Sequence, residues 1–355
     1  MKKYFSLSLL RFIALVQFIL LTGIILAQPP AGYYNGTQGL TGEALRAKLH
    51  DIIKGHTSVS YSSIYTYFQS TDKKPNNTVW DMYSDVPGGT PPYVYYYNQD
   101  ECGNYNSEGD CFNREHSWPS SWFNDNMPMR TDLFHIYPTD GYVNNRRSNY
   151  PYGEVNNPTW TSMNGSKLGP CSYPGYSGTA FEPIDEYKGD FARTYFYMST
   201  RYYKEDQGWQ SNAMVNGANL KDWAVQMLLE WHHNDPVSAK ETDRNNAVYA
   251  IQHNRNPFID EPLFADRIWG GATAIQETST VTYAWPLPFS DQLNVTVSTA
   301  NDPALTIWIT DITGRVVIEA HGEAHETTTL NTSLLKPGLY ILKTNASPAI
   351  KIIKQ

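Results

Sequence analysis

The sequence predicts an α+β protein in which a helix-rich first part is followed by a small all-β domain. Two observations predict this order. Apolar residues recur at helical spacing in several stretches between residues 42 and 253. From Val281 onward, short runs of β-branched and apolar residues alternate with turn signals such as Pro337-Gly338. We therefore expect helices packed around short strands, and then a β-sandwich.

Residues 1–27 are typical of a signal peptide, because two lysines precede an apolar run that ends at Ala27, a small residue suited to cleavage. A membrane anchor is the alternative interpretation. Arg11 interrupts the apolar run, and the segment that starts at Gln28 resembles a mature N-terminus. We therefore expect export with cleavage, and no stable membrane span after the signal is removed.

The formal net charge is -8 at pH 7, which excludes a basic field over the whole molecule. This argues against a tight, processive DNA-binding protein, but it leaves room for an enzyme with a local basic site. The three cysteines are too few for a disulfide scaffold. We expect a bridge between Cys102 and Cys111, which would close a short loop, and a free thiol at Cys171.

The first elements are predicted as follows. Apolar spacing predicts a helix over about residues 42–55, whereas residues 57–70 could form a strand or a loop. Residues 76–110 are rich in Gly, Pro, Asn and Tyr and should be mostly loop, with short strands at 78–80 and 93–97. Another short strand is expected to end near His116.

The next elements are more helical. We expect a short helix from Asp140, its N-cap, to Tyr150, which Pro151 pushes out of the α region. Residues 160–185 are expected to be an irregular loop. Three further helices follow, one capped by Asp190, one over about 220–231 and one from Asp235-Pro236 to about His253. A Thr/Ser/Ala-rich linker is predicted over 272–280.

Two segments carry residues suited to chemistry. In Asn113–Pro119, the carboxylate Glu115 stands beside His116, whose imidazole titrates near neutrality and could accept a proton from water. On the short helix after Asp140, Asn144, Arg147 and Ser148 should share a face. Glu115 and the Asn144 amide oxygen are hard ligands suited to Mg²⁺, and arginines can hold a phosphate oxygen. Such a set could cleave a phosphodiester.

The region from Tyr33 to Ile268 resembles the bacterial endonuclease I family, which comprises periplasmic and secreted nucleases with a ββα-metal (His-Me finger) site. The strongest resemblance lies in Cys111–Tyr150. Further matching segments are Leu40–Gly42, Gly189–Arg193, Trp231–Val237 and Asn254–Asp260. The resemblance implies a ββα finger packed among several helices, in a nuclease domain that spans residues 28–271.

The resemblance also implies roles for individual residues. The metal-binding asparagine of the family follows a Gly-x-Val motif, here Gly141-Tyr142-Val143, and therefore corresponds to Asn144 rather than Asn145. Glu115 would be the second metal ligand and His116 the general base. The implied cofactor is Mg²⁺, with Ca²⁺ or Mn²⁺ as alternatives.

Several basic residues could contact the substrate phosphate. Arg147 is our candidate for a catalytic arginine, and Arg146 for a substrate contact, since at least one of this pair should bind phosphate. Arg114 and Arg130 are weaker candidates. His135 could contact the substrate, but a buried structural role explains it equally well.

Residues 281–355 resemble the C-terminal sorting domain of proteins exported by type IX secretion. The matching features are Pro288–Asp291, Asp311 with Gly314, and Leu339–Lys343 before a lysine-bearing end. A small binding module of the same fold class is the alternative.

These observations predict a secreted or surface-attached nuclease, exported through the periplasm of a gram-negative bacterium. It would be a monomer that hydrolyses DNA, and RNA as well if the site does not read the sugar, with little sequence selectivity. The family resemblance implies 5′-phosphate products. Its other partner would be the secretion machinery. A secreted ribonuclease on the same scaffold is one alternative, and a non-catalytic adhesin or glycan-binding protein is another.

Overall fold

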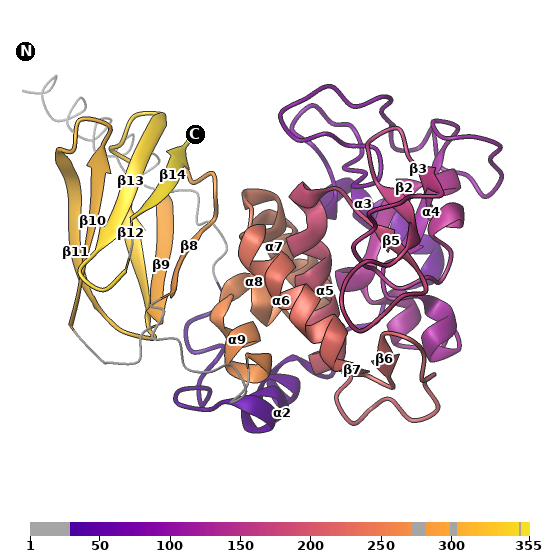
Figure 1. The fold of residues 1–355 in the computed structure, drawn as a ribbon, viewed down its shortest axis with the longest axis horizontal. Helices are drawn as coiled ribbons and strands as arrows, with labels where there is room; N and C mark the ends of the chain where they lie inside the picture. The colour runs from indigo at the N-terminus through magenta and orange to yellow at the C-terminus, as the bar shows by residue number, and fades with distance from the viewer. Residues whose placement is uncertain (1–28, 271–280, 299–303, 348) are drawn as a thin grey trace, which may run out of the picture. The chain divides into compact units, whose positions relative to one another are not determined.

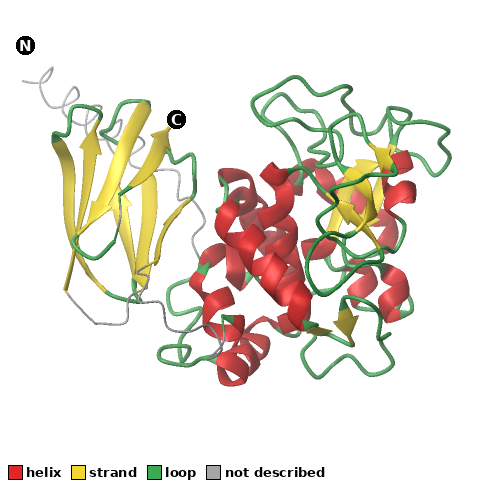
Figure 2. Cartoon of the chain, viewed as in Figure 1, coloured by secondary structure: helices red, strands yellow, loops and turns green. Residues whose placement is uncertain are grey.

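The computed structural model describes residues 29–270, 281–298, 304–347 and 349–355. The expected signal peptide and the linker at 272–280 lie outside these ranges. Figures 1 and 2 show that the described helices all precede residue 271 and that only strands follow it, which confirms the predicted α+β class. Within the described residues, no helix combines the length and the apolarity needed to cross a membrane.

The α-helices of the first part are short to medium in length. Their bounds are α2 (Gly42–Ile53), α3 (Ile64–Thr71), α4 (Gly141–Arg147), α5 (Lys188–Arg201), α6 (Asp222–Asn234), α7 (Ala239–Gln252), α8 (Pro257–Asp260) and α9 (Leu263–Trp269). Helix α5 is central, because all of its residues are buried and it packs against α2, α6 and α8. It therefore forms the core of the helical layer (Figure 1).

A compact strand–strand–helix unit holds the two segments that carry the candidate chemistry. Strand β1 (Phe112–His116) pairs antiparallel with β2 (Ile136–Asp140), so that His116 lies opposite Ile136. Helix α4 follows β2 directly, and the Asp140 carboxylate accepts a hydrogen bond from the Val143 amide, as predicted for an N-cap. The helix ends at Arg147, earlier than expected, because Ser148 adopts a positive φ of 54°.

The predictions for the loop-rich segments were partly wrong. Residues 64–71 form α3, because Ile64 and Phe68, four residues apart, are both buried on one helix face. No strand forms at 78–80 or 93–97. Val79 forms only an isolated bridge with Lys73 and one backbone hydrogen bond to Tyr95, and neither extends into a ladder. Residues 160–185 are more regular than expected, since β3 (Trp160–Thr161), β4 (Lys167–Pro170) and β5 (Thr179–Glu182) form an antiparallel sheet.

Two predicted helix starts were also wrong. Helix α5 begins two residues before Asp190, whose carboxylate pairs with Lys240 instead of capping the helix. Helix α7 begins at Ala239, because Ser238 and Glu241 form a reciprocal capping box. A further pair of two-residue strands, β6 (Val215–Asn216) and β7 (Asn219–Leu220), precedes α6.

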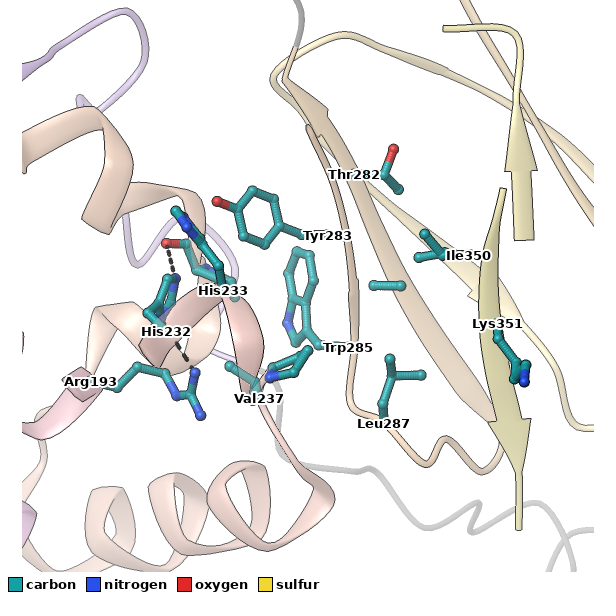
Figure 3. A pocket seen from close by; sticks show the side chains of 13 residues that line it. Arg193, His232, His233, Val237, Thr282, Tyr283, Trp285, Leu287, Ile350 and Lys351 are labelled. Atoms are coloured by element: carbon teal, nitrogen blue, oxygen red, sulfur yellow. Dashed lines mark hydrogen bonds between the residues drawn. The ribbon is translucent and has the colours of Figure 1, made fainter. Parts of the chain in front are cut away.

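The end of α6 carries two histidines with different environments. His232 is buried, accepts a hydrogen bond from Arg193 at Nδ1 and donates from Nε2 to the Pro262 carbonyl oxygen (Figure 3). Its ring is therefore held in the neutral form, and burial, with the nearby Arg193 charge, lowers its pKa to about 3. His233 instead pairs with Asp266 at 2.8 Å.

The C-terminal part is a sandwich of two antiparallel sheets, as predicted. One sheet has the strand order β11-β10-β13-β14 and the other β12-β9-β8. The bounds are β8 (Val281–Trp285), β9 (Gln292–Ser298), β10 (Ala304–Asp311), β11 (Val316–Glu323), β12 (Thr327–Asn331), β13 (Gly338–Thr344) and β14 (Ile350–Lys354). Alternate residues of both sheets, such as Val295 and Ile307, form one buried apolar core.

The cysteines follow the prediction. Cys102 and Cys111 form a disulfide, with Cα atoms 5.8 Å apart, immediately before β1. Cys171 is a free, buried thiol.

Candidate active site

Glu115 lies in the centre of the β1–α4 interface and is 2% exposed. Its Oε1 accepts hydrogen bonds from Arg147 and from the Tyr83 hydroxyl, each at 2.9 Å. Burial raises the pKa of Glu115, whereas the Arg147 charge and the two hydrogen bonds oppose this rise. Among the described residues, Oε2 has no hydrogen-bond partner, so that one carboxylate oxygen remains available to a ligand.

Arg147 extends from α4 to the end of β1, and its side chain is fully buried. Besides Glu115, its guanidinium donates to the carbonyl oxygens of His116 at 3.0 Å and Ser117 at 2.5 Å, and to the Tyr195 hydroxyl at 3.2 Å. The Glu115 charge raises the pKa of Arg147 in spite of its burial. In this position Arg147 connects α4 to the backbone around His116 and does not face solvent.

Asn144 lies one turn before Arg147 on the same face of α4. Its Nδ2 donates to the Asn113 Oδ1 at 2.7 Å, and Asn113 precedes Glu115 by two residues, on the same face of β1. The two pairs, Asn144–Asn113 and Arg147–Glu115, therefore bring Asn144 and Glu115 to one side of the β1–α4 interface. The Asn144 Oδ1 accepts no hydrogen bond from any described residue.

A carboxylate oxygen and an amide oxygen are the ligand types that suit a hard divalent cation that keeps several water ligands, as Mg²⁺ does. Within the described ranges, no group of three or more His, Cys, Asp or Glu side chains could hold a metal ion. One carboxylate with one amide oxygen, completed by water, is a ligand set compatible with Mg²⁺.

His116 is half-buried at the end of β1, and its tautomer follows from one contact. Nε2 lies 3.1 Å from the Arg130 carbonyl oxygen, which can only accept a hydrogen bond, so Nε2 carries the proton. Nδ1 then keeps its lone pair. Burial, followed by the nearby His135, lowers the pKa of His116 to about 3, so the ring is neutral at pH 7.

Two arginines converge beside His116 on the ring of Tyr61. The Arg114 guanidinium lies 3.8 Å and that of Arg130 4.7 Å from the Tyr61 ring centroid, and the Tyr61 ring stacks on His116 at 6.2 Å. Both arginines are half-buried, and the buried Nε of Arg130 has no hydrogen-bond partner in the described structure. This side of His116 is therefore cationic.

The remaining predicted site residues lie on either side of this centre. His135 is fully buried behind His116, with ring centroids 5.3 Å apart, and its Nε2 donates to the Met129 carbonyl oxygen at 2.7 Å. Arg146 is exposed on the outer face of α4, away from Glu115. The structure therefore places Glu115, Asn144 and Arg147 at one interface, with His116, Arg114 and Arg130 beside it.

Sequence reasoning missed four residues that shape this site, namely Tyr61, Tyr83, Asn113 and Tyr195. Asn113 could have been found, because strand periodicity places it on the same face as Glu115. The three tyrosines come from distant segments, and only the fold brings them to β1.

Comparison with known proteins assigns the family. Residues 41–263 match the profile of the endonuclease I family. The chain belongs to this family. An extracellular ribonuclease of Bacillus subtilis (strain 168) is 36% identical over 246 residues, which cover 67% of this chain and 78% of the relative. This endonuclease I homologue is therefore a nuclease and a hydrolase, and the predicted family resemblance is confirmed.

More distant relatives align with a shorter region. Endonuclease-1 of Buchnera aphidicola subsp. Acyrthosiphon pisum (strain APS) is 28% identical over 132 residues, covering 37% of this chain and 45% of the relative. A periplasmic deoxyribonuclease of Aeromonas hydrophila is 24% identical over 135 residues, covering 38% and 48%. Residues 283–355 match the secretion system C-terminal sorting domain, so the endonuclease I homologue is a secreted or surface-attached nuclease.

Proposed function

We propose that this endonuclease I homologue hydrolyses phosphodiester bonds of DNA, and of RNA, with His116 as general base and with Mg²⁺ held by Glu115 and Asn144. The observation that carries the proposal is the His116 tautomer. The Arg130 carbonyl oxygen accepts the Nε2 proton, which leaves the Nδ1 lone pair to accept a proton from water. His116 follows Glu115 directly in β1, and Arg147 donates both to Glu115 and to the His116 carbonyl oxygen, which supports assigning the base and the proposed metal ligand to one site.

The reaction needs one base and one source of positive charge. Water attacks phosphorus while its proton moves to Nδ1 of His116, and the bond from phosphorus to the 3′ oxygen breaks, which yields a 5′-phosphate. Glu115 and Asn144 would hold Mg²⁺, which would supply positive charge to stabilise the leaving oxygen. Arg114 and Arg130 contact the non-bridging phosphate oxygens from the Tyr61 side.

Arg147 has a positioning role in this scheme. Its hydrogen bonds to Glu115 and to the His116 carbonyl oxygen fix the metal ligand and the base relative to each other. His135 also has a positioning role, because its ring packs against the His116 ring from the interior.

The attacking group is water rather than a ribose hydroxyl, so this arrangement does not discriminate RNA from DNA. The names of the relatives cover both substrates, since the Bacillus subtilis protein is called a ribonuclease and the Aeromonas hydrophila protein a deoxyribonuclease. A secreted enzyme that acts mainly on RNA remains the second candidate.

The test uses the full mature chain with supercoiled plasmid and, separately, with structured RNA, each with Mg²⁺, Mn²⁺, Ca²⁺ or chelator. We expect metal-dependent cleavage that falls by about 10²- to 10⁴-fold in His116→Ala, the usual contribution of a general base. His253→Asn, at the exposed histidine that ends α7, is the matched control and should leave cleavage unchanged. Cleavage that survives in His116→Ala would refute the assignment of the base.

We further propose that the protein is a monomer that is exported through the periplasm of a gram-negative bacterium. The β-sandwich of residues 281–355 would act as its sorting signal. Its match to a secretion sorting domain supports this route. Deletion of these residues should retain nuclease activity inside the cells, whereas normal release without them would contradict the proposal.

A further inference from the structure

A cluster of aromatic and cationic side chains lies on the outer face of α4. Tyr142 and Arg146 are four residues apart on this helix, and Trp160 comes from β3. The Arg146 guanidinium lies 5.6 Å from the Tyr142 ring centroid and 5.5 Å from that of Trp160, and the two rings are 6.4 Å apart. We refer to these three residues as the α4–β3 cluster.

The α4–β3 cluster is accessible and its charge is not neutralised by a neighbour. Arg146 is exposed and both rings are half-buried. Within the part of the chain that the structure describes, Arg146 has no ion pair and no side-chain hydrogen bond, unlike Arg147, whose guanidinium is enclosed by four partners. The cluster therefore offers a nucleic acid a positive charge and two accessible aromatic rings on a chain of net charge -8.

The position of the cluster relates it to the candidate active site. Asn144 lies between Tyr142 and Arg146 in sequence, but it points to the opposite face of α4, toward Asn113. A helix with its side chains is about 10–12 Å across. A nucleic-acid strand with one phosphate at the β1–α4 interface would therefore cross α4 within a few nucleotides.

We propose that Tyr142, Arg146 and Trp160 form a stacking platform for the bases of a single-stranded nucleic acid next to the phosphodiester that is hydrolysed. The proposal rests on the proposed function, because it extends the substrate site from the phosphate to the neighbouring bases. Any base can stack on an aromatic ring or on a guanidinium plane, which requires no sequence selectivity. In a duplex the bases are already paired and stacked, so the platform favours single strands.

Binding can be measured separately from cleavage. The full mature chain, in chelator, is titrated with a fluorescent single-stranded oligonucleotide and with a hairpin duplex of similar length. We expect Trp160→Ala to raise the Kd for the single strand by about 5- to 150-fold, the range for loss of one base–aromatic contact. The Kd for the duplex should change much less, and Trp160→Phe should retain most of the affinity.

Two further variants test whether the loss of affinity is specific to the α4–β3 cluster. Tyr203→Ala is the control, because Tyr203 is a half-buried tyrosine that contacts a cation, Lys204, outside the cluster. Its ring packs on His50 of α2, so this variant should leave both Kd values unchanged. Arg146→Met should weaken single-strand binding and reduce its salt dependence, because one cation is lost. Loss of affinity for an uncharged oligosaccharide instead, with no effect on the oligonucleotide, would mean that the cluster binds glycans and would overturn the proposal.

The result separates this proposal from the proposed function. If His116→Ala still cleaves but Trp160→Ala loses single-strand affinity, the assignment of the base fails and the platform stands. If Trp160→Ala binds the single strand as tightly as the unmodified protein, or loses equal affinity for both substrates, the platform is refuted whatever the result for His116.

Discussion

Replacing Arg147 by methionine distinguishes the two roles that this residue could have. The sequence predicted a catalytic contact with phosphate, whereas the structure buries the guanidinium against Glu115 and the backbone of His116 and Ser117. A phosphate contact would make Arg147→Met inactive but fully stable. A connection between β1 and α4 would make it both inactive and strongly destabilised.

The expected loss of folding stability follows from the groups that lose Arg147 as an ion-pair or hydrogen-bond partner. Methionine keeps much of the apolar volume, so the cavity contribution is small. Glu115, 2% exposed, would lose its cation, and removing one partner of a buried ion pair costs about 3–5 kcal/mol. Ser117 keeps the hydrogen bond from Tyr195 to its carbonyl oxygen, so its loss is smaller. We therefore expect the free energy of unfolding to fall by about 4 kcal/mol.

The assay is urea unfolding followed by the helical circular dichroism signal, which reports on residues 42–269 because the described residues beyond 280 form only strands. Arg146→Met is the matched control. Arg146 is exposed, so its replacement should change stability by no more than about 0.5 kcal/mol. If Arg147→Met unfolds within about 1 kcal/mol of the unmodified protein while cleavage is lost, the positioning role is wrong and a direct phosphate contact is supported.

Three other variants test further parts of the molecule. Asn113→Ala should weaken Mg²⁺ binding, measured calorimetrically, by about 10- to 100-fold, because it removes the acceptor that orients Asn144, the metal ligand that we propose, whereas Asn145→Ala should have no effect. His232→Gln should reduce acid sensitivity. The unfolded chain binds a proton at this histidine near pH 6.5, whereas the folded chain binds it only near pH 3. The free energy of unfolding therefore falls as pH is lowered between these values, by at most about 5 kcal/mol. A urea midpoint that falls equally in the variant and in the unmodified protein between pH 7 and pH 4.5 would contradict this. Replacing Cys102 and Cys111 together by serine should cost about 2–3 kcal/mol, and a thermal unfolding midpoint that does not move would rule out a stabilising bridge.

The sequence predicted the main elements of the candidate site because their signals are local. Asp140 is an N-cap residue in sequence and caps α4 in the structure, and the strand expected before His116 is β1. The predicted helix cap at Asp190 was wrong because a distant residue competes for its carboxylate. Asp190 has the chemistry of a cap, but Lys240, fifty positions away, pairs with its carboxylate, and no local pattern contains that contact.

The support of the site could not be predicted from local patterns. Tyr83 and Tyr195 contact Glu115 and Arg147 from segments that are 32 and 48 residues distant. Tyrosine is abundant in this chain, with 26 copies, so neither residue stands out in the sequence. Tyr195 lies on α5 and Tyr83 lies between α3 and β1, so that only the tertiary packing of these segments brings the two hydroxyl groups to the site.

The adjacent arginines of α4 show how one fixed position could have extended the prediction. Successive residues of a helix are rotated by about 100°, so two neighbouring side chains cannot both face the β1–α4 interface. Helical spacing in the sequence already placed Asn144 and Arg147, three residues apart, on one face of this helix, and the same geometry turns Arg146 outward with Tyr142. Helix geometry therefore separates a buried arginine that donates to Glu115 from an exposed one that we propose as a nucleic-acid contact, although the two have the same chemistry and are adjacent in the sequence.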